Sequence, residues 1–346
     1  MNGRLDRLRE RLEEPLLVSS PANVRYLCGL VSSNAALVVE PERVRLFTDF
    51  RYLETARELE GVEVVDAKRD LFQTLSEELT GKVGFEARWL SFEHYSRLHA
   101  GGIELVARYG LVEELRAVKD EDELDAIRRA AGITNTAFER FAGEGDIVGR
   151  TERELAWRFE QFLHEENADG VAFAVTMASG PNSAKPHTEL TDRPVEPGEV
   201  LLVDAGCMVD GYCSDCTRTF ATGPLPDELE RAYEVCLDAQ LAALEAVRPG
   251  ASGPGVDSAA RDRITAAGFG DAFGHGLGHG VGLAVHEDPR LAKESTSILA
   301  AGNVVTVEPG IYLTGLGGIR IEDLVVVTDG EPEILTTFPK DLRTLD

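Results

Sequence analysis

The chain has 346 residues, which is enough for two domains that each bury an apolar core. Its 61 acidic residues outnumber its 35 basic residues and give a formal net charge of -26. A charge of this sign opposes binding to nucleic acids and to anionic membranes, so we expect neither partner. The acidic residues are spread along the chain, and no apolar run approaches the roughly 18 residues of a membrane-spanning helix.

The first residues, MNGRLDRLRERLEE, have the pattern of a charged amphipathic helix and lack the apolar centre of a signal peptide. The five cysteines are an odd number and do not indicate a disulfide framework. We therefore expect a cytoplasmic protein. Because self-repulsion of this size is tolerable where salt screens charges over about 3 Å, as at 1 M, we hypothesise a high-salt cytoplasm such as that of a halophilic archaeon.

Residues 1–118 alternate short helical and strand patterns, which is typical of an α/β domain. The patterns predict strands over 16–19, 35–39, 44–47, 62–65 and 83–85, and helices over 50–59, 71–79 and 92–99. No catalytic motif stands out there, and Asp49 and Arg51 are most simply surface or capping groups. We place the domain boundary at residue 118, before a charged run, KDEDE.

Residues 119–346 begin with a long amphipathic pattern over 121–141, followed by a capping box, TERE, that opens a helix over 152–166. A strand over 172–178 and a hairpin follow, and then helices over 227–247 and 256–267 and Gly-rich strands to residue 327. Two helices followed by strands, twice, suggest an internal pseudo-repeat. These patterns predict one compact α+β domain.

The hairpin, residues 199–220, has the sequence EVLLVDAGCMVDGYCSDCTRTF. Its Asp-Gly pair between two strand-like runs predicts a two-residue turn, and counting back from that turn puts Asp204 opposite Thr217. Asp215 is then the diagonal neighbour of Asp204 on the same face. Two carboxylates this close to an apolar strand repel each other, and a cation between them would relieve the repulsion. The alternative is two surface aspartates on an exposed strand face.

Two further acids lie in strands that read as buried: Glu308 in VVTVEPG and Glu322 in GGIRIEDLVVV. Buried carboxylates are paired or bound to a metal. The alternative partner for either acid is an arginine such as Arg320, on the same face as Glu322.

Histidines are the other candidate ligands. His275, His279 and His286 fall in FGHGLGHGVGLAVHEDP, and His187 falls in the loop SGPNSAKPH. Four core carboxylates with one histidine form an oxygen-rich set that suits two divalent ions, Mn, Co, Fe or Zn, better than one structural zinc. A CxxC pair flanks Asp215, but no second such pair accompanies it, so it is a weak zinc signal: Cys213 and Cys216.

The chain resembles the metallopeptidases of the pita-bread fold, which include methionine aminopeptidases, aminopeptidase P and prolidase. The resemblance covers about residues 119–346 and rests on DAG, SDCTRTF, GHGLGHGVGL, VEPGIY and GIRIED. Upstream, ANVRYLCGL and FTDFRYLETA are similar to the smaller creatinase-like N-terminal domain of the prolidase and aminopeptidase P branch. The implied fold class is α+β, with an α/β domain over 1–118 before a pita-bread catalytic domain over 119–346.

The resemblance implies metal ligands in the order Asp204, Asp215, His279, Glu308 and Glu322. Asp215 and Glu322 would bridge two divalent ions per subunit, with Mn or Co favoured and Zn or Fe as alternatives. A bridging hydroxide would attack the carbonyl of the Xaa-Pro bond, and Glu308 would pass the proton of the water to the leaving nitrogen.

Further roles follow from the same resemblance. His187 and His286 would stabilise the carbonyl oxygen and the tetrahedral intermediate, and Thr217 would orient the metal carboxylates. Arg290, in HEDPRL, would bind the free carboxylate of a dipeptide, for which a guanidinium fork is suited. Arg320 would brace the metal carboxylates or contact substrate. A structural role remains the alternative for each histidine, and a surface position for Arg290. His275 is expected to be structural, with contact to a ligand-supporting group as the alternative.

The leading interpretation is a dinuclear prolidase, which cuts Xaa-Pro dipeptides. The alternatives are an aminopeptidase P acting on longer peptides, a metal-dependent hydrolase or lyase of a non-peptide substrate, and a relative that binds without hydrolysis or works without metal, as creatinase does. The last alternative is disfavoured because such relatives have typically lost the ligands. The resemblance also implies a homodimer in which the N-terminal domain of one subunit lies near the other's active site, with the loop over 29–34 as the candidate contribution.

Overall fold

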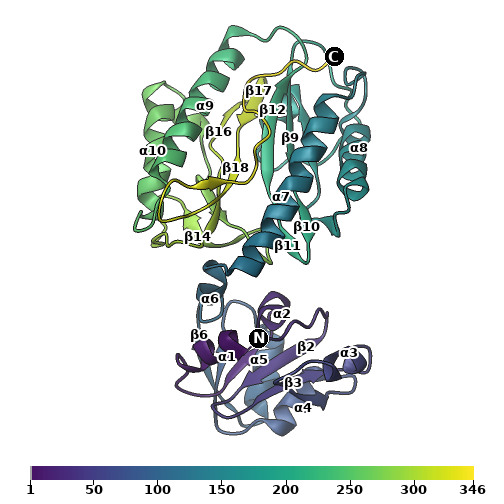
Figure 1. Ribbon diagram of the computed structural model, residues 1–346, viewed down its shortest axis with the longest axis vertical. Helices are drawn as coiled ribbons and strands as arrows, with labels where there is room; N and C mark the ends of the chain where they lie inside the picture. Colours follow the sequence, from purple (N-terminus) through teal and green to yellow (C-terminus); the bar gives the residue numbers. More distant parts are fainter. Residues whose placement is uncertain (1) are drawn as a thin grey trace. The chain divides into compact units, whose positions relative to one another are not determined.

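The computed structural model describes residues 2–346, which form two compact units that divide between Arg116 and Ala117 (Figure 1). The division lies two residues before the position at which the sequence places it. No helix among residues 2–346 combines the length and the apolar character that are needed to cross a membrane.

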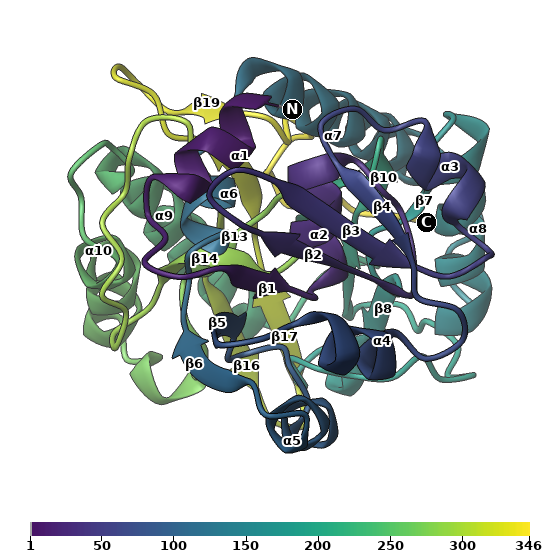
Figure 2. The same ribbon diagram turned by 90° about the horizontal axis from the view of Figure 1, so that it is seen from below.

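The first unit is built on a six-stranded sheet with the order β4-β3-β2-β1-β5-β6, whose strands are labelled in Figure 2. Strand β1 pairs antiparallel with β2 and parallel with β5, so the sheet is mixed. The strands are β1 (Leu16–Val18), β2 (Ala35–Val39), β3 (Val44–Thr48), β4 (Glu63–Asp66), β5 (Lys82–Glu86) and β6 (Glu104–Arg108). The helices are α1 (Asn2–Arg9), α2 (Pro21–Cys28), α3 (Leu53–Arg57), α4 (Leu71–Glu78), α5 (Phe92–Ala100) and α6 (Glu113–Ala117).

In the second unit, α7 and α8 lie on one side of the strands, and α9 and α10 lie on the other (Figure 1). The expected order of two helices followed by strands occurs twice. The helices are α7 (Glu121–Ala142), α8 (Glu152–Glu165), α9 (Asp227–Ala246) and α10 (Gly253–Ala266). The strands of the first half are β7 (Gly170–Val171), β8 (Thr176–Ser179), β9 (Val200–Ala205), β10 (Cys207–Val209), β11 (Tyr212–Cys213) and β12 (Cys216–Ala221). Those of the second half are β13 (Gly278–Gly280), β14 (Glu287–Leu291), β15 (Val304–Val307), β16 (Gly310–Leu313), β17 (Gly317–Arg320), β18 (Asp323–Val326) and β19 (Glu333–Ile334).

Capping residues fix where the two long helices of the first half begin. Asp120 and Glu123 form a reciprocal capping box at α7, and Thr151 and Glu154 form the predicted one at α8. Each helix then buries an apolar face, and Phe138 of α7 meets Phe159 of α8 edge to face with ring centroids 4.9 Å apart. The helices therefore present fixed faces to the strands that carry the polar residues.

The hairpin has the predicted register, with Thr217 paired with Asp204. Farther from the turn, the two strands approach closely at Gly206, where a Cβ would lie 1.9 Å from the carbonyl oxygen of Ser214. The predicted strand over 172–178 is wrong for residues 172–175. These residues cross from β7, which pairs with β10, to β8, which pairs with β9, so they belong to neither ladder.

Candidate metal centre

Five polar side chains come together from separate strands of the second unit and from the links next to those strands. Strand pairing accounts for part of this, because Val307 pairs with Asp323 and so brings the adjoining residues Glu308 and Glu322 to the same end of two neighbouring strands. The other three come from β9, from the link between β11 and β12, and from β13: Asp204, Asp215 and His279. The structure thus gathers all five residues of the predicted ligand set in one unit.

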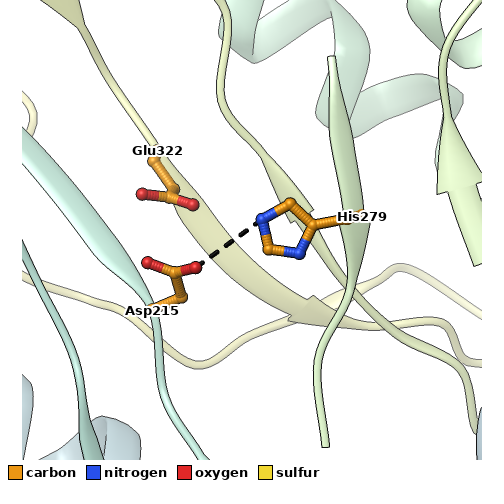
Figure 3. Close-up of side chains that lie close together, drawn as sticks. All are labelled: Asp215, His279 and Glu322. Carbon is orange, nitrogen blue, oxygen red and sulfur yellow. Dashed lines mark ion pairs between the residues drawn. The ribbon is translucent and has the colours of Figure 1, made fainter. Parts of the chain in front are cut away.

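The imidazole of His279 faces the carboxylates (Figure 3). Its Nε2 atom lies 3.7 Å from Asp215 Oδ2 and 3.2 Å from Glu308 Oε1. Its Nδ1 atom lies 3.1 Å from the carbonyl oxygen of Gly280, which holds the ring with Nε2 turned toward the acids. Three residues, Asp215, His279 and Glu322, each offer one ligand atom, and these three atoms lie within 4.8 Å of one another. One cation can span this spacing.

The carboxylates of this cluster oppose one another electrostatically. Burial raises the pKa of Glu322 to about 8, with repulsion from Glu308 and Asp204 adding to it. Burial, followed by repulsion from Glu322 and other acids, also holds the pKa of Asp215 well above its usual range. Burial acts on Glu308 too, but its hydrogen bond and attraction to His279 outweigh it and lower the pKa of Glu308 to about 2.

These properties test whether a cation suits the site. Asp204 Oδ1 is buried and has no hydrogen-bond partner within residues 2–346, which is rare for a carboxylate oxygen. Asp215 and Glu322 are only 4% and 2% exposed, so water does little to solvate their negative charges. Four carboxylates and one imidazole are donors that hard or borderline divalent ions prefer, and the residues present therefore fit divalent metal.

Two side chains on the neighbouring strands hold the acids in place. Thr217 Oγ1 donates to Glu322 Oε2 at 2.6 Å. Arg320 donates from Nη2 to Asp204 Oδ2 at 2.5 Å and from Nε to Thr217 Oγ1 at 3.0 Å. The arginine partner considered for Glu308 or Glu322 therefore pairs with Asp204, and it lies at 5% exposure beneath the acids.

Sequence reasoning missed Tyr312, which joins Arg320 to His275. Tyr312 OH accepts from Arg320 Nη1 at 3.0 Å and lies 2.9 Å from His275 Nε2. Because His275 Nδ1 lies 2.8 Å from a carbonyl oxygen, which can only accept, Nδ1 carries the hydrogen and Nε2 accepts from Tyr312. Burial lowers the pKa of His275, which favours this neutral form. The VEPGIY sequence contains Tyr312, but nothing local signals its partners.

A second unpredicted group lies behind the acids. Arg218 is 1% exposed and donates to the carbonyl oxygens of Thr217, at 3.0 Å, and Glu322. Its Nη2 atom also bonds Asp323 Oδ1 at 2.9 Å, and Lys340 Nζ bonds Asp323 Oδ2 at 2.6 Å. Arg218 thereby ties together the backbones of the two strands that carry Thr217 and Glu322.

The remaining predicted residues lie at the exposed side of the centre. The ring of His286 is exposed and packs edge to face on the ring of His279, with centroids 4.4 Å apart. Burial lowers the pKa of His286; electrostatic effects of His279, Arg290 and His187 lower it further, and Glu308 opposes them. His187 and Arg290 are exposed, the former on the loop after β8 and the latter on β14.

The CxxC pair does not have the character of a zinc site. The thiol groups of Cys213 and Cys216 are both buried, and neither forms a disulfide bond within residues 2–346. Burial raises the pKa of the Cys216 thiol far above its usual range, which disfavours the thiolate that a metal would need.

Comparisons with known proteins cover both units. The sequence profile of metallopeptidase family M24 matches residues 125–329, and that of the creatinase/prolidase N-terminal domain matches residues 4–118. An Xaa-Pro dipeptidase from Pyrococcus furiosus is 32% identical over 349 residues, which cover 99% of this chain and 100% of that protein.

Solved structures of Xaa-Pro peptidases are also similar to this chain over nearly its whole length. A structure of an Xaa-Pro dipeptidase from Bacillus anthracis superposes with a TM-score of 0.95 at 34% identity and covers 99% of both chains. One of an X-Pro aminopeptidase from Thermotoga maritima has a TM-score of 0.87 at 35% identity, covering 97% of this chain and 99% of that one. The predicted fold class, an α/β creatinase-like domain before a pita-bread domain, is confirmed.

Proposed function

The chain belongs to metallopeptidase family M24, and we propose that it is a prolidase, which hydrolyses the peptide bond of Xaa-Pro dipeptides. The observation that carries the proposal is the cluster of buried acids around His279, seen in a chain that aligns over nearly its whole length with Xaa-Pro dipeptidases. The cluster supplies the chemistry, and the relatives suggest the substrate.

Two divalent ions per subunit would be held by the five side chains of the cluster, among which Asp215, His279 and Glu322 have ligand atoms within 4.8 Å of one another. Mn or Co is the proposed metal, with Zn or Fe as alternatives. When bound, such ions lower the pKa of water and polarise a carbonyl group. Arg320 would offset part of the negative charge at Asp204, and Thr217 would keep Glu322 in one orientation.

The proton would be moved by Glu308. Its low pKa keeps it ionised at neutral pH, so it can accept a proton from the attacking water. The same carboxyl group can then donate that proton to the nitrogen of the departing proline. Thr306, which donates to Glu308 Oε1 at 3.1 Å, would hold the carboxylate in place for both transfers.

The exposed groups would bind and orient the dipeptide. His286 and His187 can donate hydrogen bonds to the oxygen on which negative charge develops during attack. Arg290 would bind the free carboxylate of the proline residue, which favours dipeptides over longer chains. Its exposure and its effect on the pKa of His286 support a place on the substrate side.

A second candidate function is removal of the N-terminal residue from longer Xaa-Pro peptides. The similarity to the X-Pro aminopeptidase from Thermotoga maritima, at 35% identity, favours it. A hydrolase or lyase of a non-peptide substrate uses the same ligands and remains the third candidate.

We propose a cytoplasmic homodimer in a high-salt cell. The formal net charge of -26 supports the high-salt setting, because such a charge is best tolerated where salt screens it.

Hydrolysis of a Met-Pro dipeptide and of an Xaa-Pro-Xaa tripeptide, in high KCl with Mn or Co added, tests the proposal. Cleavage of the dipeptide alone is the expected result. Efficient cleavage of the tripeptide would transfer the assignment to aminopeptidase P, and cleavage of neither by protein with two bound metals would indicate a non-peptide substrate.

A further inference from the structure

A buried ion pair lies beside the exposed histidine of the site. Lys119 Nζ donates to Glu287 Oε1 at 2.8 Å, and the two side chains are only 1% and 7% exposed. Lysine and glutamate are seldom buried to this extent, and a buried pair stabilises a fold less than apolar residues of the same size would. Stability alone therefore does not explain why this position is charged.

Glu287 is placed so that its side chain controls the segment carrying His286. It directly follows His286 and begins β14, where it pairs across the ladder with Gly280, the residue after His279. The loop between the two strands passes close to its carboxylate: a Cβ on Gly282 would lie 2.3 Å from Glu287 Oε1. A shift of the carboxylate would therefore move the backbone on either side of His286.

The backbone around Lys119 is held by hydrogen bonds to the segment that precedes β15. Its backbone nitrogen donates to the carbonyl oxygen of Gly302 at 2.9 Å, and Asn303 Nδ2 donates to the carbonyl oxygen of Ala117 at 2.8 Å. The next residue, Asp120, caps α7. Because Asn303 leads directly into β15, the strand that ends before Glu308, the lysine is fastened to a framework that also positions a candidate metal ligand.

We propose that Lys119 is a positioning residue for His286. By fixing the Glu287 carboxylate, it sets the start of β14 and so keeps the His286 ring against the His279 ring, on the substrate side of the metal centre. The consequence for catalysis rests on the proposed function. Without the pair, metal binding should persist, whereas His286 should no longer face the substrate reliably.

The test compares Lys119→Met, Glu287→Met and the double variant, each measured for thermal unfolding, metal stoichiometry and dipeptide hydrolysis. Either single variant breaks the buried ion pair and should be less stable than the wild type. The double variant should regain most of that stability and bind metal as the wild type does, yet keep a kcat/KM at least about 10-fold lower. Recovery of kcat/KM together with stability would show that the pair is only structural and would overturn the proposal.

A second comparison measures the effect of Lys119→Met in a variant that lacks the His286 ring. In a His286→Ala background, Lys119→Met should cause little further loss of kcat/KM, because two residues that act through one another are not additive. A full additional loss would mean that Lys119 acts by another route. Lys293→Met is the matched control, since Lys293 is exposed shortly after β14, and its kcat/KM should equal that of the wild type.

A structural readout separates this proposal from the proposed function. Crystal structures of the wild type and the double variant would give the separation of the His279 and His286 ring centroids, 4.4 Å here. We expect a displaced or disordered His286 ring in the variant. An unchanged ring would refute the positioning role, whereas failure of the wild type to cut any Xaa-Pro peptide would refute only the proposed function.

Discussion

Arg320 binds one oxygen of Asp204, Oδ2, at 2.5 Å and leaves the other oxygen, Oδ1, buried with no hydrogen-bond partner within residues 2–346. The two oxygens of one carboxylate therefore have different tasks. One is neutralised by a fixed guanidinium, and the other is available to a cation. Because Arg320 binds only Oδ2, a buried arginine can contact Asp204 and still leave Oδ1 for a cation.

Replacing Arg320 should destabilise the catalytic unit. Arg320→Met leaves Asp204 and Tyr312 without their buried donor, and breaking such a pair costs about 3–5 kcal/mol. Urea unfolding in the presence of a chelator measures the loss. The control is Arg153→Met, which breaks an exposed pair with Asp192 and should cost no more than about 1 kcal/mol. Equal losses in the two variants would contradict the prediction.

Asp215→Asn should abolish metal uptake and activity while preserving the fold. The variant replaces a carboxyl group whose ionised form is disfavoured by burial and by the neighbouring acids, so its thermal unfolding temperature with a chelator should equal or exceed that of the wild type. Its activity should fall at least about 100-fold, the upper effect seen for groups that only support a metal ligand. Wild-type turnover by a variant with two bound metals would disprove the assignment.

The metal-free protein should become less stable as pH rises from 5 to 9. The pKa of Glu322 is raised from 4.5 to about 8, so the folded chain keeps a proton that the unfolded chain releases, and stability falls across that window. The pKa of His279 is raised from 6.5 to about 9, so its stabilising contribution is complete below 6.5 and is also lost toward 9. Because the pKa of Glu308 is lowered from 4.5, this residue changes the pH dependence of stability only below pH 4.5.

Calorimetry with a chelator should show this fall as a decrease in Tm of at least about 5 °C. The same series with saturating Mn²⁺ is the control, and its slope should be flatter because a cation favours the ionised carboxylates. A Tm that rises with pH in the chelator would refute the electrostatic account of the centre.

Arg290→Ala should raise the KM for Xaa-Pro dipeptides about 10-fold or more and leave kcat nearly unchanged, because the contact is made equally in the ground and transition states. Tripeptide hydrolysis should be unaffected. Arg248→Ala, which also removes an exposed arginine, serves as the control. An unchanged KM for dipeptides would mean that the proline carboxylate is bound elsewhere.

Salt should stabilise the whole chain. Screening of the formal net charge of -26 lowers repulsion in the folded state, so the free energy of unfolding should rise with KCl up to molar concentrations. A non-ionic osmolyte at equal osmolality is the control for effects other than charge. Equal stability at low and high KCl would remove the basis for the high-salt hypothesis.

The part of the site that the sequence determined is local. The alternation of a strand and the two-residue Asp-Gly turn set the register that puts Thr217 opposite Asp204, since turn geometry and a period of two residues fix which side chains share a face. Buried acids in apolar strands, Glu308 and Glu322, could be recognised for a similar reason: an ionised group has no place in such a run unless it has a partner.

Only the tertiary structure decided which partner each group has. Arg320 is 116 residues from Asp204 in sequence, and Lys119 is 168 residues from Glu287. Local periodicity says which face a side chain lies on and nothing about which distant strand covers that face. The ring contact of His286 with His279 and the link from Tyr312 to His275 depend on the packing of β13, β14, β16 and β17, and so they exist only once those strands are assembled.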